Sequence, residues 1–192
     1  MKRLLTVLAL VVSPLIAADQ TDDQRIEEAT AALPEYLRAG ASVAMTDADG
    51  SPRALKTGSN GFKCRPDGPE PGFKVVCGEA TVNGFFAAVR PIVSKATSKA
   101  ERRELIDAAI EKGIIKIPMP GSRNYVLSGP DRQRAKLLLT IFLPGATAES
   151  TGLSTERSDG TWLMCPGSPG AHIMVGDIPH GQDEDRWKKC GR

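Results

Sequence analysis

Two cysteines, Cys64 and Cys77, lie in a segment of the chain that is crowded with turn-forming residues. Residues 58–77 contain four glycines and three prolines. So many breakers disfavour a helix or a central strand. We therefore predict a loop closed by a Cys64–Cys77 disulfide, with the remainder of the domain arranged around it.

The N-terminus predicts the compartment. Lys2 and Arg3 precede an apolar run at residues 4–16, which ends at the small residues Ala17 and Ala18. This is the pattern of a secretory signal peptide covering residues 1–18. Because the run is shorter than the ~20 residues that a membrane-spanning helix needs, we expect no transmembrane segment in the mature chain. The predicted location is the periplasm or the extracellular medium.

The cysteine count agrees with export. The chain has four cysteines, Cys64, Cys77, Cys165 and Cys190, and an even number in an exported chain indicates disulfides. We favour Cys64–Cys77 with Cys165–Cys190, because each pair is nearest in sequence, while the other two connectivities stay open. Neither pair has the short spacing of a zinc knuckle.

Apolar periodicity predicts both helices and strands in one domain over residues 19–192, with a polar tail from about residue 177. Helical spacing or capping signals occur in three segments, 21–33, 81–93 and 98–113, with a further turn of helix near Glu149. Strand signals occur at 41–46, 52–56, 114–119, 124–127, 137–143, 162–165 and 172–175. The expected fold is α+β, with N-terminal helices packed on a small, largely antiparallel sheet stapled by disulfides.

Charge and motifs exclude several function classes. Residues 1–18 carry two of the 25 basic residues and none of the 23 acidic ones, so the predicted mature chain has equal numbers of each. That balance gives no support to nucleic-acid binding. No phosphate loop or dinucleotide fingerprint occurs, so we predict no cofactor.

Both histidines of the chain lie near its C-terminal end, where the best candidate for chemistry occurs. His172, Asp177 and His180, followed by Asp183 and Glu184, combine imidazole and carboxylate groups that suit a divalent metal ion. The alternative is structural: a strand histidine and an exposed tail histidine.

A serine hydrolase is the other catalytic reading of this region. Ser168 lies close to His172 in sequence. However, Pro169 directly after the serine removes a backbone N–H that an oxyanion hole would use.

The cysteine-bracketed segment offers a different kind of site. Asn60, Phe62 and Asp67 could contact a protein or small-molecule ligand, because loops on rigid scaffolds often carry function. Turn formation by Asn60 and Asp67, and core packing by Phe62, explain the same residues without a ligand.

Residues 58–67, GSNGFKCRPD, closed by Cys77, and residues 171–175, AHIMV, resemble the corresponding segments of a group of uncharacterised exported bacterial proteins. The chain departs from that group at Gly170-Ala171, where Gly-Pro is usual. The resemblance implies export, the first disulfide and the fold, and it transfers no catalytic residue. The function expected first is a non-enzymatic exported binding or interaction protein, and the alternative is a small metal-dependent or serine hydrolase centred on His172.

Overall fold

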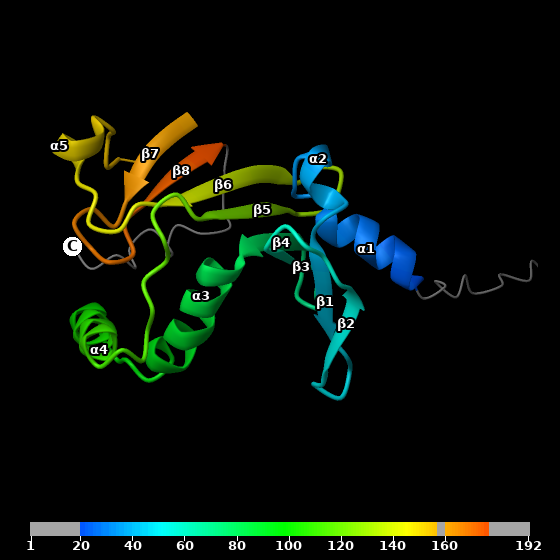
Figure 1. Ribbon diagram of the computed structural model, residues 1–192, viewed down its shortest axis with the longest axis horizontal. Coiled ribbons are helices and arrows are strands. Elements are labelled where there is room, and N and C mark those ends of the chain that lie inside the picture. Colours follow the sequence, from blue (N-terminus) through cyan, green and yellow to red (C-terminus); the bar gives the residue numbers. More distant parts are fainter. Residues whose placement is uncertain (1–19, 157–159, 177–192) are drawn as a thin grey trace, which may run out of the picture.

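One mixed sheet forms the centre of the protein. The structure, a computed structural model, describes residues 20–156 and 160–176, and its strands follow the order β2-β1-β3-β4-β5-β6-β8-β7 across an eight-stranded sheet (Figure 1). The strands are β1 (Ser42–Thr46), β2 (Pro52–Lys56), β3 (Phe62–Arg65), β4 (Phe73–Glu79), β5 (Arg123–Gly129), β6 (Lys136–Phe142), β7 (Gly160–Met164) and β8 (His172–Gly176). Neighbouring strands pair antiparallel except β1 and β3, which are parallel.

The predicted α+β fold is therefore confirmed in part: helices and a largely antiparallel sheet are present, but two details of the expectation are wrong. The sheet is large rather than small, and the helices are not confined to the N-terminal part. Among the described residues the helices are α1 (Asp22–Thr30), α2 (Glu35–Arg38), α3 (Ala80–Val93), α4 (Lys99–Glu111) and α5 (Ala148–Thr151). The pair α3–α4 is inserted between β4 and β5, which are neighbours in the sheet. None of the helices in residues 20–156 and 160–176 has both the length and the apolar character needed to cross a bilayer.

Local capping explains why the helices begin where they do. Thr21 and Gln24 form a reciprocal capping box at the start of α1. The hydroxyl of Ser98 accepts a hydrogen bond from the Glu101 N–H at the start of α4, at 3.1 Å. These bonds satisfy backbone N–H groups that have no partner inside the helix. Gly113, at a φ of 69°, follows the end of α4, as its position in the sequence predicts.

The segment 58–77 is not a loop throughout, which corrects the sequence-based prediction. Its ends form β3 and β4, both interior strands of the sheet. The turn residues are concentrated at 58–61 and 66–72, so they leave two short runs that are free of breakers apart from Gly78. In β3, Phe62 and Cys64 are buried while Lys63 and Arg65 are exposed, which is the period of two expected of a strand.

The predicted strand at 114–119 is also wrong. This segment is an irregular connection from α4 to β5. Pro118 and Pro120 lack the backbone N–H that a ladder needs, and both edges of β4 and of β5 are already occupied by neighbouring strands. The apolar residues of the connection therefore have no strand partner.

Three apolar clusters make up the core. The largest joins α1 to residues of β1, β3, β4 and β5, and it includes Leu33, Phe62, Val75 and Tyr125. The second joins α3 and α4 to Phe142 at the end of β6. Leu139 packs on the first cluster and Phe142 belongs to the second, so the two clusters use opposite faces of β6. The third is built on Trp162 and Met174.

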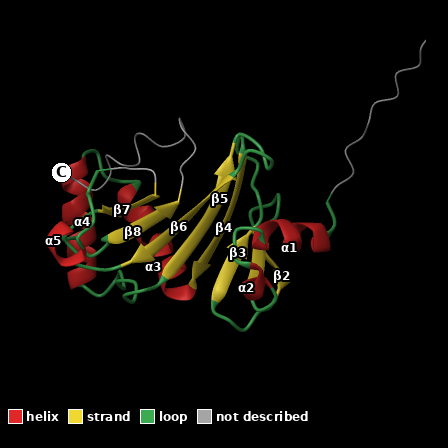
Figure 2. Ribbon diagram, turned by 90° about the horizontal axis from the view of Figure 1, so that it is seen from above, coloured by secondary structure: helices red, strands yellow, loops and turns green. Residues whose placement is uncertain are grey.

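The helices form two groups around the sheet. Figure 2 shows α1 and α2 beside β1 to β3, and α3, α4 and α5 towards the other end. Helix α4 packs on α3, while α3 also contacts β3 and β4. The α3–α4 hairpin thus extends away from the sheet, and the connection 112–122 carries the chain back to it (Figure 1).

Candidate functional site

Asn60 and Asp67, the polar candidates of the cysteine-bracketed segment, are both engaged in turns. The Asn60 amide nitrogen donates to the Leu37 carbonyl at 2.7 Å, and its oxygen accepts from the Phe62 N–H at 3.1 Å. The Asp67 carboxylate accepts from the N–H groups of Gly68 and Lys74 at 3.1 and 2.8 Å. These bonds fix the entry to β3 and the β3–β4 turn.

Gly58 shows how closely this segment lies against the preceding backbone. The N–H groups of Ser59 and Asn60 both donate to the Gly40 carbonyl, at 2.8 and 3.0 Å. A Cβ atom at position 58 would overlap the Gly40 carbonyl oxygen and the Ala41 carbonyl carbon. Glycine is therefore required by a backbone contact rather than by a ligand.

Phe62 is a core residue. Its side chain is 1 % exposed, with the Tyr125 ring edge-on at a centroid distance of 5.8 Å. The Arg123 guanidinium lies 5.2 Å from the ring centroid and forms an ion pair with Glu79 at 2.8 Å. A ring covered on these sides does not meet a ligand.

The first predicted disulfide is confirmed. Cys64 and Cys77 are joined and stand directly opposite each other in the β3–β4 register. Cys165 is also disulfide-bonded, while Cys190 lies outside the described residues. A thiol nucleophile is absent from the described part of the chain, because no cysteine there is free.

His172, at the start of β8, is held by its own backbone turn. Its Nδ1 lies 2.6 Å from the Gly170 carbonyl oxygen, and its ring stacks at a tilt on Phe142, with centroids 5.3 Å apart. Asp177, His180, Asp183 and Glu184 lie outside the described residues. Over 20–156 and 160–176, no group of three or more His, Cys, Asp or Glu side chains could hold a metal ion.

Ser168 is not arranged as a nucleophile. Its hydroxyl donates to the Cys165 carbonyl at 2.7 Å and accepts from the Gly170 N–H at 3.2 Å. This is a local turn of the kind that Ser commonly forms. Within the described residues no hydrogen bond joins Ser168 to His172, so the structure shows no serine–histidine pair.

The environment of His172 predicts a pH-dependent stability. Burial lowers the pKa of the imidazole below its usual 6.5, although the Gly170 carbonyl partly opposes that shift. As the pH falls below about 6.5, the unfolded chain takes up a proton before the folded one does. The free energy of unfolding should therefore decrease from pH 6.5 towards 5, by at most about 1.4 kcal/mol per pH unit.

Urea denaturation at a series of pH values would measure this dependence. The His172→Gln variant should lose most of the slope between pH 5 and 6.5, since carboxylates titrate mainly at lower pH. An identical slope in this variant would show that another group causes the pH dependence.

A surface that sequence reasoning missed lies on the α3–α4 hairpin and the connection that follows. Seven large apolar side chains are exposed in the described chain, and five of them fall between residues 86 and 119. These five are Phe86 (43 %), Leu105 (38 %), Ile114 (62 %), Ile117 (40 %) and Met119 (63 %). We call the last three, which lie within six residues of one another, the apolar ridge.

The apolar ridge is part of a well-anchored segment. Ile115 and Pro118, which alternate with the ridge residues, are buried. The N–H groups of Ile114 and Ile115 donate to the Ala109 carbonyl, and the Ser122 N–H donates to the Met119 carbonyl. The exposed side chains are thus presented by a fixed backbone. One sequence signal could have indicated this exposed segment. Pro118 and Pro120 interrupt its apolar run, and prolines at these positions argue against a buried strand.

Comparison of the chain with protein-family models, with curated proteins and with solved structures finds no match. Its function has to be inferred from its own residues.

Proposed function

We propose that the protein is an exported binding protein without hydrolytic activity, which contacts its partner through the apolar ridge. The observation that carries this proposal is the concentration of exposed large apolar side chains on one part of the described chain. Contiguous exposed apolar surface on a folded protein commonly marks an interaction site. The ridge residues lie in sequence on a single connection that is hydrogen-bonded at both of its ends.

The arrangement of the catalytic candidates supports the same conclusion. Ser168 is occupied by two backbone hydrogen bonds, and His172 Nδ1 faces the Gly170 carbonyl. A nucleophile and a base must lie within hydrogen-bonding reach of each other to act together. The described residues contain no such pair at this site.

A hydrophobic dye can test the apolar ridge in the native protein. We expect the wild-type chain to enhance the fluorescence of anilinonaphthalene sulfonate, and the triple variant Ile114→Ser/Ile117→Ser/Met119→Ser to lose most of that signal. Because the three side chains are exposed, each substitution should change the free energy of unfolding by about 0.5 kcal/mol or less, and the triple variant should stay within about 1.5 kcal/mol of wild type. Tyr36→Ser is the matched control, since Tyr36 is 78 % exposed on α2, and it should keep the signal.

Equal dye binding by the triple variant and the wild type would contradict the proposed surface. The absence of hydrolysis is tested separately with esters, peptides and glycosides. Turnover by the wild type that disappears in His172→Ala would overturn the binding-protein proposal in favour of the hydrolase.

A further inference from the structure

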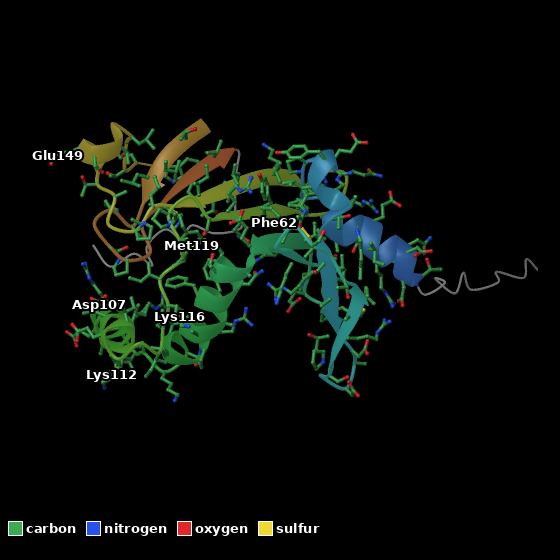
Figure 3. All side chains as sticks on the ribbon, in the orientation of Figure 1. Phe62, Asp107, Lys112, Lys116, Met119 and Glu149 are labelled. Atoms are coloured by element: carbon green, nitrogen blue, oxygen red, sulfur yellow. A yellow bond between two sulfur atoms is a disulfide. The ribbon has the colours of Figure 1, made fainter. Side chains whose placement is uncertain are left out.

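The apolar ridge is interleaved with lysines. Lys112 precedes Ile114, and Lys116 stands between Ile114 and Ile117; both lysines are exposed. Neither forms an ion pair with another residue of the described chain. Figure 3 shows Lys112, Lys116 and Met119 along the connection that leads from α4 towards the sheet.

The local charge is positive over a longer stretch. From Lys112 to Arg123 the chain has three basic residues and no acidic one. Arg123 is paired with Glu79, which leaves the two lysines as the charges of this stretch that form no ion pair within the described residues. Asp107, one turn before the end of α4, faces Arg103 at 3.8 Å, and Glu111 is the acidic residue directly before the stretch.

The small size of the apolar ridge favours a lipid bilayer over another protein as its partner. A standard protein–protein interface buries about 800 Å² on each side and uses roughly 20–30 residues per partner. Three apolar side chains separated by a lysine cannot form the apolar core of such an interface. Binding to a bilayer needs less apolar surface, because a few inserted apolar side chains together with nearby lysines give reversible binding to anionic lipid.

We infer that the apolar ridge docks on an anionic phospholipid surface, with Ile114, Ile117 and Met119 entering the interfacial region and Lys112 and Lys116 contacting the headgroups. This inference rests on the proposed function and names the partner of the same surface. The buried Ile115 and Pro118 keep the connection in place, so docking needs no rearrangement of the sheet.

Vesicle flotation with the mature chain tests the inference. Vesicles of phosphatidylcholine with about one-third phosphatidylglycerol should bind the protein at low salt, and vesicles of pure phosphatidylcholine should bind it much less. Lys112→Gln/Lys116→Gln should weaken binding about 25-fold, since each lysine near an anionic surface contributes about fivefold. The triple serine variant of the ridge should weaken it about tenfold or more.

Matched controls separate the ridge from general charge. Lys63→Gln/Lys95→Gln removes the same charge from exposed positions on β3 and after α3 and should bind as wild type does. Binding of the wild type should also fall at about 0.5 M salt, where screening shortens the reach of the lysines.

Three results would overturn the lipid assignment. They are no flotation with anionic vesicles, equal flotation with neutral ones, or a dimer of the wild type that the triple serine variant dissociates. If the dye still binds the ridge in the first two cases, the proposed binding surface stands and only its lipid partner is wrong.

Discussion

Phe62→Ala should lower the free energy of unfolding by about 3–5 kcal/mol, the range for deleting a fully buried aromatic ring. The ring is 1 % exposed and belongs to the largest apolar cluster, and its removal would leave a cavity against Tyr125. It would also remove the aromatic face beneath the Arg123 guanidinium. Urea denaturation followed by circular dichroism measures the loss.

Phe86→Ala is the control for this experiment. It deletes the same atoms from a ring that is 43 % exposed, although the ring also contacts Phe85 and Phe142, so its loss should be clearly smaller. A loss below about 1 kcal/mol for Phe62→Ala would show that the ring is accessible in solution, and Phe62 would again be a ligand-contact candidate.

Removing the central disulfide should have an effect of similar size. Cys64 and Cys77 are separated by 13 positions, and a loop of that length corresponds to about 3 kcal/mol in the chain-entropy model. We expect Cys64→Ala/Cys77→Ala to fold with the same circular dichroism spectrum and to unfold at a lower urea concentration. The register of β3 with β4 survives because backbone hydrogen bonds and the flanking pairs also define it.

Two measurements complete the disulfide test. Peptide mapping of the unreduced wild-type protein should recover Cys64 joined to Cys77. The single variant Cys64→Ala also lacks the cross-link but keeps a buried thiol at Cys77. The difference in stability between the single and the double variant therefore reports the packing of the Cys77 side chain alone. If the double variant were as stable as wild type, the cross-link would contribute nothing beyond the strand pairing.

Local signals in the sequence predicted the elements that depend on neighbouring residues. The N-cap Ser98 and the stop at Gly113 bound α4 as expected, because capping acts within one turn of the chain. The strands predicted at 41–46 and 52–56 correspond to β1 and β2, and the turn between them contains Gly50 at a φ of 85°. The Cys64–Cys77 bond was predicted from proximity in sequence.

Non-local pairing could not be predicted in the same way. The 58–77 segment contains enough breakers to indicate a loop, yet β3 and β4 form interior strands because β1 and β5 supply their hydrogen-bonding partners. The parallel pairing of β1 with β3 and the insertion of α3–α4 between neighbouring strands leave no periodic signal in the sequence. These features exist only once distant segments are side by side.

The candidate functional residues also show the difference between what residue type predicts and what tertiary contacts decide. Residue type alone made Asn60, Phe62 and Asp67 reasonable ligand contacts, and tertiary contacts engage all three in the fold. The same tertiary contacts decide exposure at residues 114–119, where Ile115 is buried and Ile114 is not.

Short-range chemistry in the sequence was enough to predict a mixture of helices and strands, the starts and ends of most helices, and the Cys64–Cys77 disulfide. The tertiary structure decided the eight-stranded sheet, the interior position of β3 and β4, and the exposure of Ile114, Ile117 and Met119. The physical reason is that burial and strand partnership belong to pairs of distant segments, and no single segment carries that information.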